Sequence, residues 1–190
     1  MTKEKTRCDW CLKDDLYKKY HDEEWGKPVK DDSVLFEFLI LESFQAGLSW
    51  HTVLKKRENF RKAFKQFDAK KVAKFTQTDI DRLMADEGII RNKLKIEAAI
   101  NNAKLFLALQ KEYGTFADFI WKFTNHKTIV NHLKSIKDLK PTSEISDLMS
   151  KELGKLGFKF RGSTICYAFM QAVGMVDDHL DTCWRKSNYI

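Results

Sequence analysis

The sequence contains little of what interrupts helices or marks a secreted or membrane-bound chain. Among its 190 residues there are only two prolines and eight glycines, and no segment shows sustained alternation of apolar and polar residues. No apolar run approaches the roughly 18–20 residues that cross a bilayer. The first residues, MTKEKTRCDW, lack the apolar stretch of a signal peptide. We therefore expect an all-α, cytoplasmic protein with no membrane partner.

Cysteine is also scarce, with four residues at positions 8, 11, 166 and 183. In an intracellular chain of this size, such cysteines more often bind metal or lie buried than form disulfides. Cys8 and Cys11 form a CxxC pair, but no strand pattern of the thioredoxin kind surrounds it. A redox role for this pair is therefore not expected.

What the sequence does contain is material for a core and an excess of positive charge. Apolar residues make up 43% of the chain, with 14 Phe and 5 Trp, and the formal net charge is +7. Residues 1–190 are long enough for one domain, built as helical lobes around a shared core, and nothing suggests an obligate dimer. The basic balance fits a polyanionic partner such as nucleic acid, but a solvated lysine-rich surface produces the same balance.

Helical periodicity recurs along the chain and predicts eight to ten helices. In residues 93–114 apolar side chains fall at three- and four-residue steps, and Gly114 is a suitable stop. Residues 31–44 are apolar on most sides, which predicts a central, buried helix. Thr78 and Asp81 resemble a capping box at the start of a short helix, and Pro141 marks a linker. Further helices are expected near 49–64, 115–124, 144–156 and 163–174.

Metal-binding residue types occur at both ends of the chain. His179 and Cys183 are four residues apart, a spacing that places two side chains on one face of a helix. A cysteine and His21 from the N-terminal block would complete a tetrahedral Cys2His2 set, which zinc favours. The spacing does not decide whether Cys8 or Cys11 is the ligand. Separate buried cysteines and surface histidines are the alternative.

Aromatic residues gather near these blocks, and one carboxylate stands out among apolar neighbours. A pocket for a flat heteroaromatic ligand, such as a flipped nucleobase, uses stacking rings and a polar contact at the base edge. Glu42 ends the apolar run SVLFEFLILE, where a carboxylate is costly unless it is paired or functional. The alternatives are a core role for the rings and a solvent-facing Glu42. The rings are Trp10, Tyr17, Tyr20, Trp25 and Trp50.

Taken together, six blocks in this order resemble the bacterial 3-methyladenine DNA glycosylase I family, over almost the whole chain. QAGLSW, YHDEEWG and GFKFRGSTICY are the most specific signals. The blocks are RCDW (7–10), LYKKYHDEEWG (16–26), LFEFLILESFQAGLSWHTVLKKRENF (35–60), GIIRNKLKI (88–96), GFKFRGSTICYAFMQAVG (157–174) and DDHLDTC (177–183). Ser43 and Phe44 depart from what family members often carry.

The resemblance implies an all-α helix-hairpin-helix DNA glycosylase fold, with the helix-hairpin-helix at about 146–174 and a zinc clasp that joins the N- and C-terminal segments. It implies a closed, structural Zn2+ site and leaves Cys11 outside that site. The implied zinc ligands are Cys8, His21, His179 and Cys183.

The resemblance also implies a base pocket and a DNA-binding surface. Glu42 is implied as the residue that recognises the base and acts at the catalytic site. The implied base-binding residues are Trp10, Tyr17, Tyr20, Trp25, Glu42 and Trp50. The Gly47–Leu48 turn is expected to enter the duplex, and the hairpin to bind phosphate. The implied hairpin contacts are Lys159, Arg161, Gly162 and Ser163.

The implied function is base-excision repair, with 3-methyladenine hydrolysed from double-stranded DNA by a monofunctional enzyme that acts as a monomer. N3-methylation makes the base cationic and a good leaving group, so selection against normal adenine matters more than acid assistance. Two other functions remain open. A non-catalytic, zinc-stabilised DNA-binding module would share the charge, the hairpin and the clasp. A zinc hydrolase would need an open metal position, which four ligands leave no room for.

Overall fold

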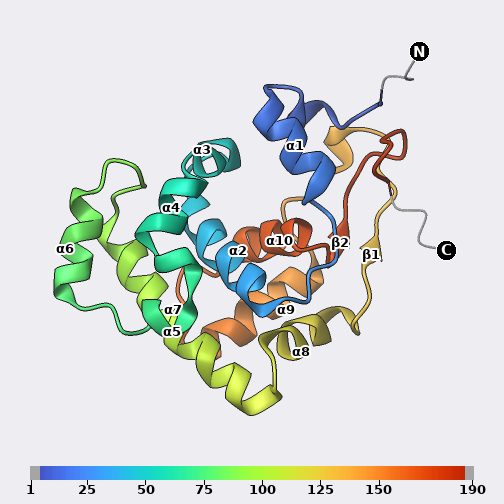
Figure 1. Ribbon diagram of the computed structural model, residues 1–190. Coiled ribbons are helices and arrows are strands. Elements are labelled where there is room, and N and C mark those ends of the chain that lie inside the picture. Colours follow the sequence, from blue (N-terminus) through green and yellow to red (C-terminus); the bar gives the residue numbers. More distant parts are fainter. Residues whose placement is uncertain (1–4, 187–190) are drawn as a thin grey trace.

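The computed structural model describes residues 5–186, most of which lie in helices (Figure 1). Within that range there are ten α-helices, four short 3-10 helices and two short strands. In chain order they are η1 (Asp9–Cys11), α1 (Asp15–Glu23), α2 (Asp32–Gln45), α3 (Trp50–Lys55), α4 (Arg57–Ala63), η2 (Lys65–Phe67), α5 (Ala69–Val72), α6 (Gln77–Ala85), α7 (Lys93–Tyr113), α8 (Phe116–Ile120), η3 (Trp121–Thr124), β1 (Ile129–Val130), η4 (Ile136–Asp138), α9 (Glu144–Lys155), α10 (Ser163–Ala172) and β2 (Val176–Asp177).

Helix α2 forms the centre of the molecule, as its apolar sequence predicts. It begins where the Asp31 carboxylate accepts hydrogen bonds from the backbone N–H groups of Ser33 and Val34. Every residue from Leu35 to Phe44 is buried. Helices α3, α7, α8 and α10 pack around it (Figure 1). A helix enclosed in this way leaves no solvent-facing position for a charged side chain along that stretch.

Two expectations about helices need correction. The segment near 49–64 forms two helices rather than one, because the chain turns at Lys56 between α3 and α4. The capping box of α6 lies two residues earlier than the sequence suggested, and pairs Thr76 with Asp79. Helix α7 ends at Gly114 as expected, and the glycine adopts φ +88°, a value that side chains disfavour.

The region after α10 is not helical, which corrects the expectation that His179 and Cys183 share a helix face. The chain instead forms β2, which pairs in parallel with β1 through Ile129–Val176 and Val130–Asp177. His179 and Cys183 follow β2 in an extended segment and a turn. The positions of His179 and Cys183 are therefore set by the path of the loop after β2, and not by a helical period.

The two ends of the described chain lie side by side, as the clasp requires. Figure 1 shows η1 and α1 next to the segment that follows β2. The backbone N–H of Trp184 donates to the carbonyl of Thr6 at 2.9 Å. Lys186 donates to the carbonyl oxygens of Asn131 and His179. The Trp184 contact joins this segment to the N-terminal block, and the Lys186 contacts tie it to Asn131 and to the residues around His179.

Helices α9 and α10 pack against each other and are joined by a short hairpin. Gly157 turns the chain there with φ +93°. Phe158 is buried, and Lys159 is exposed. The N-cap of α10 is Gly162, so no side chain caps the first N–H groups of this helix. No helix within residues 5–186 is long and apolar enough to cross a membrane.

Candidate active site

All six side chains expected to bind a base line one cavity of about 200 Å3. They come from the first four elements of the chain: η1, the region of α1, α2 and α3. The packing of α1 and α3 against each other and of α3 against α2 brings these elements together. The residues are Trp10, Tyr17, Tyr20, Trp25, Glu42 and Trp50.

Glu42 is the buried carboxylate of this cavity. Its side chain is 2% exposed, and its Oε2 atom has no hydrogen-bond partner in the described part of the chain. Burial raises its pKa to about 8, because no nearby cation compensates for the lost water. A buried acceptor without a partner is rare in folded proteins and points to a ligand group that would satisfy it.

The rings surround the cavity at edge and tilted angles. Trp10 lies edge-on to Tyr17 and to Trp25, at centroid distances of 4.8 and 4.9 Å. Tyr20 and Trp50 lie 5.3 Å apart at 45°. The Trp50 indole N–H is buried without an acceptor in the described residues. Among themselves these rings make edge-on and tilted contacts, and the flat stacks are made with rings outside the set: His51 on Tyr17, His21 on Trp25 and Phe38 on Trp50.

His51 and Asp14 hold Tyr17 in place from behind. The His51 ring is buried and stacks on Tyr17 at 4.9 Å, and its Nε2 atom lies 2.5 Å from the Asp14 carboxylate. Asp14 is also the N-cap of α1 and accepts from the Tyr17 N–H. Burial, with Glu42 nearby, raises the pKa of Tyr17 to about 12, so its hydroxyl stays protonated.

The turn after α2 carries Gly47 and Leu48 beside the cavity. Gly47 has φ +79°, and Leu48 is 43% exposed although it is a large apolar residue. The buried ammonium of Lys95, on α7, donates to the carbonyls of Phe44 and Ala46 at 2.9 and 2.5 Å. Lys95 thereby caps the end of α2, just before the turn. The turn is anchored from below while its tip remains exposed.

Ser43 and Phe44, the two departures from the family pattern, face away from the cavity. The Ser43 hydroxyl donates to the Leu39 carbonyl within the same helix. Phe44 is fully buried and packs edge-on against Phe60 and Phe64. Neither residue lines the cavity. Both belong to the core.

Three of the four expected metal ligands form a compact cluster. The ligand atoms of Cys8, His21 and Cys183 all lie within 4.8 Å of one another, and all three residues are buried. Hydrogen bonds from Cys8 and His21 lower the pKa of Cys183. Cys11 is not part of the cluster, and its thiol donates to the Cys8 carbonyl at 3.1 Å.

The fourth expected ligand, His179, lies next to this cluster. Its ring centroid is 4.9 Å from that of His21, and its buried Nε2 atom has no partner in the described residues. Its Nδ1 atom lies 2.8 Å from Asp177, just as the Nδ1 atom of His21 lies 2.8 Å from Asp22. Gly26 makes room for the ring, since a Cβ there would lie 2.7 Å from it.

Of the four hairpin residues expected to bind phosphate, two are exposed and two are engaged in contacts within the protein. Lys159 and Gly162 are exposed. Arg161 folds back over α9, where its guanidinium occupies the space beside Gly154. The Ser163 hydroxyl lies within hydrogen-bond distance of Ser146 and of the Asp147 carboxylate, at 2.8 and 2.5 Å. The charged tip of Arg161 is therefore engaged within the protein.

Sequence reasoning missed several residues of the cavity. Gln45 and Gln171 supply amide groups, and Ile136, Leu139 and Ala168 supply apolar wall. Gln171 lies four residues after Tyr167 in the block 157–174, and this spacing places both on one face of α10. That pattern was available in the sequence. No sequence pattern indicated that η4 approaches the cavity, because this approach depends on the path of a long loop.

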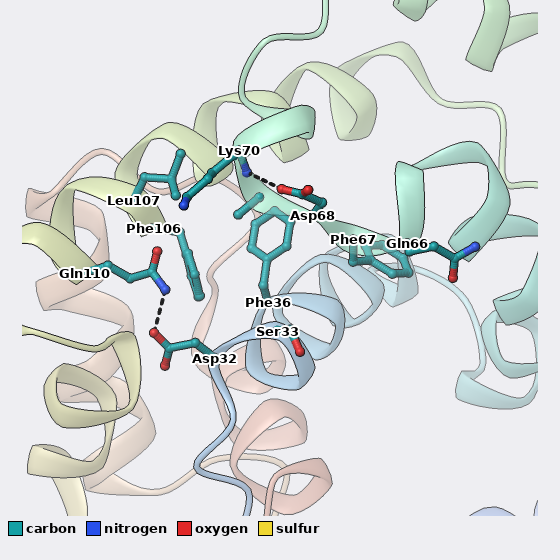
Figure 2. A pocket seen from close by; sticks show the side chains of 11 residues that line it. Asp32, Ser33, Phe36, Gln66, Phe67, Asp68, Lys70, Phe106, Leu107 and Gln110 are labelled. Carbon is teal, nitrogen blue, oxygen red and sulfur yellow. Dashed lines mark hydrogen bonds between the residues drawn. The ribbon is translucent and has the colours of Figure 1, made fainter.

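Figure 2 shows a larger hollow, of about 360 Å3, between the start of α2, the η2–α5 region and α7. No expected site residue lines it. Asp32 accepts from Gln110 and from two backbone N–H groups at the start of α8, and Asp68 caps α5. Both of its carboxylates are thus used to begin helices. None of the described residues that line this hollow has a buried polar side-chain atom without a hydrogen-bond partner. The aromatic cavity has two such atoms, in Glu42 and Trp50.

Comparisons with known proteins agree with this geometry. The sequence profile described as methyladenine glycosylase matches residues 10–186. A "DNA-3-methyladenine glycosylase" of Haemophilus influenzae is 53% identical over 96% of this chain and 99% of its own. A crystal structure of a 3-methyladenine DNA glycosylase I has a TM-score of 0.93 at 47% identity, covering 96% of this chain and all of that one. A variant of such an enzyme in complex with 3-methyladenine has a TM-score of 0.92 at 39% identity, covering 95% and 97%. On these grounds the chain belongs to the methyladenine glycosylase family.

Proposed function

We propose that this protein is a DNA-3-methyladenine glycosylase, which hydrolyses the N-glycosidic bond of 3-methyladenine in alkylated DNA. The observation that carries the proposal is Glu42, a buried and unpartnered carboxylate in a cavity lined with electron-rich rings. A planar, cationic base with an amino group matches both features. The products are the free base and an abasic site in the DNA, as expected of an enzyme in base-excision repair.

The cavity selects the lesion by charge as well as by shape. Methylation at N3 gives the base a positive charge in DNA, and each ring face that it stacks on contributes about 0.5–2 kcal/mol of cation–π attraction. An ionised Glu42 adds direct attraction and accepts a hydrogen bond from the amino group. Both contributions are weaker for neutral adenine. Selection of the lesion over normal bases therefore follows from the cavity itself.

The chemical step needs little from the protein beyond this binding. The C1′–N9 bond breaks and its electron pair stays on the base, which leaves as a neutral molecule. Water forms the new bond at C1′ and gives up one proton to the solvent. Among the described residues that line the cavity there is no lysine to attack the sugar. The enzyme is accordingly monofunctional. Glu42 acts at the catalytic site by binding the base and by its charge near the cationic sugar, not as a nucleophile.

We infer that two regions contact DNA, the Gly47–Leu48 turn and the hairpin before α10, and Lys95 lies between them. Lys95 caps α2 just before the Gly47–Leu48 turn, and its ammonium also lies 5.9 Å from the ring of Phe160 in the hairpin. An exposed Leu48 can fill the gap that a flipped base leaves in the duplex. The uncapped N-terminus of α10 at Gly162 offers N–H groups to a phosphate, as in a helix-hairpin-helix. Lys159 supplies charge there, and Arg161 would have to leave its place on α9.

A structural zinc ion fits the four residues that join the chain ends. The fit rests on the unpartnered Nε2 atom of His179 and on the close grouping of Cys8, His21 and Cys183. Each histidine directs Nδ1 to a carboxylate, which leaves Nε2 for a metal. Two thiolates and two imidazoles form a closed tetrahedral set for zinc. When bound, the ion would join the segments, and it would take no part in hydrolysis.

The test is release of base from duplex DNA treated with a methylating agent, identified by chromatography. The wild type should release 3-methyladenine, and Glu42→Gln should release it much more slowly. Glu58→Gln is the matched control, since Glu58 is exposed and does not line the cavity. If folded wild-type protein released no methylated base but bound DNA, a non-catalytic DNA-binding module would replace this proposal.

A further inference from the structure

Asp178 is a buried carboxylate next to the cavity that the reaction as described does not use. It is 3% exposed and follows directly after β2. It accepts three hydrogen bonds, from the Asn131 amide at 2.7 Å, the Tyr167 hydroxyl at 2.8 Å and the Gln171 amide at 2.7 Å. Burial and the neighbouring Asp178 raise the pKa of Tyr167, so the tyrosine remains a donor. Donors thus surround this carboxylate.

This arrangement fixes which way the Gln171 amide points. A carboxylate accepts hydrogen bonds, so the amide must turn its NH2 group toward Asp178. Tyr167 and Gln171 lie one helical turn apart on α10, and both donate to the same oxygen, Oδ2. The carbonyl oxygen of Gln171 is left without a partner in the described part of the chain. Because Gln171 lines the aromatic cavity, that oxygen is available to a ligand there.

We propose that Gln171, oriented by Asp178, is a specificity-determining residue that accepts a hydrogen bond from the exocyclic amino group of the bound base. The proposal rests on the base pocket proposed above. Glu42 on α2 and Gln171 on α10 line the same cavity. An adenine amino group has two N–H bonds and can donate to both residues. A base with a carbonyl at that position has no hydrogen to give, and its oxygen would face the fixed acceptor of Gln171.

The orientation matters because a free amide would not discriminate. A glutamine amide offers an acceptor on one side and donors on the other, so an unanchored one can turn to suit either base. Gln45 also lines the cavity, and its amide makes no hydrogen bond of this kind with the described residues, so it represents the unanchored case. An anchored acceptor instead penalises a carbonyl, because the facing oxygens would be desolvated and unpaired. Asp178 therefore acts on specificity through Gln171 and is a positioning residue.

Two free bases that differ in the group at this position provide the test: 3-methyladenine, with an amino group, and 3-methylhypoxanthine, with a carbonyl and one added ring N–H. Binding is measured by quenching of tryptophan fluorescence in the zinc-loaded protein. The readout is the ratio of the two dissociation constants. A general loss of structure weakens both bases together and leaves that ratio unchanged, so the ratio separates specificity from stability.

The decisive variant is Gln171→Met, which keeps the length of the side chain and removes its acceptor. We expect 3-methyladenine to bind about tenfold more weakly, the usual effect of one lost hydrogen bond, and 3-methylhypoxanthine to bind no more weakly than before. Tyr167→Phe is the matched control, because it removes a neighbouring donor to Asp178 and leaves Gln171 anchored. Its ratio should equal that of the wild type.

Asp178→Asn tests the anchor, since an asparagine presents a donor as well as an acceptor. Part of the discrimination should be lost, with the zinc content unchanged. An unchanged ratio in Gln171→Met would overturn the proposal, and an unchanged ratio in Asp178→Asn alone would overturn the role of Asp178. If Glu42→Gln weakened 3-methyladenine binding while Gln171→Met did not, the pocket would stand without this acceptor. If neither variant changed binding, the location of the pocket itself would be wrong.

Discussion

The burial of Glu42 predicts that this residue makes the folded protein less stable as the pH rises. Burial raises its pKa from an ordinary value of 4.5 to about 8 in the folded state. Between these values the unfolded chain has released the proton and the folded chain still holds it. The folded state thus binds more protons, and its stability falls with increasing pH. Above pH 8 both states are ionised, and the cost is constant.

The size of this effect follows from the difference in pKa. From pH 5 to pH 8 the contribution of Glu42 to the free energy of unfolding should fall by about 3 to 4 kcal/mol, because the slope is about 1.4 kcal/mol per unit and is smaller close to each pKa. The Glu42→Gln variant lacks this titration. It still buries a polar group, so its absolute stability can lie on either side of the wild type, but its dependence on pH should be shallower.

The assay is urea unfolding of both proteins at several pH values from 5 to 8, with zinc present. The two share every other titrating group, so the difference between their free energies of unfolding isolates residue 42. That difference should move by about 3 to 4 kcal/mol in favour of the variant as the pH rises. A difference that stays constant within error would refute the reasoning, because Glu42 would then be solvated in the free protein.

Three further predictions follow from the site. The kcat/KM for release of 3-methyladenine from DNA should rise with pH up to about 8 and then level off, since the free enzyme must ionise Glu42; a flat profile in the wild type would contradict this. His179→Ala should lower both the amount of bound zinc, measured by metal analysis, and the melting temperature. The control is Cys166→Ser, which replaces a buried thiol outside the cluster and should retain one zinc per chain. Lys95→Met should slow base release from duplex DNA more than it weakens binding of free 3-methyladenine, because it removes the cap at the end of α2 beneath the Gly47–Leu48 turn. Equal effects in both assays would mean that the lysine only supports the core.

Local sequence patterns predicted those parts of the molecule that depend on local interactions. The buried character of α2 and the end of α7 at Gly114 follow from apolar periodicity and glycine chemistry, and the structure confirms both. The family resemblance is confirmed as well. The residues alone left the grouping of the six cavity side chains as one alternative beside a core role, and the resemblance favoured the pocket, because no local pattern encodes how their elements pack.

Errors arose where tertiary contacts override local periodicity. The i, i+4 spacing of His179 and Cys183 suggested a helix, but β2 pairs with β1 and holds the segment extended. Asp178 went unassigned for the same reason. Its role is visible only when Asn131, Tyr167 and Gln171 are seen to converge on it from two other elements. A polar network of this kind is formed by residues distant in sequence, and its members look unremarkable one at a time.

Glu42 and Asp178 show how two buried carboxylates in neighbouring positions acquire different tasks. Asp178 accepts three hydrogen bonds, which commit it to holding other groups in place. Glu42 lacks a partner at Oε2 and keeps its proton near neutral pH, so the free pocket carries no uncompensated charge. A cationic base supplies the missing partner, and ionising Glu42 at pH 7 then costs only about 1.4 kcal/mol, one unit of pKa. A neutral base does not stabilise the ionised form in the same way. The need to ionise Glu42 therefore adds to the preference for a charged lesion, and the free energy of that ionisation is small enough for the binding of the cationic base to offset.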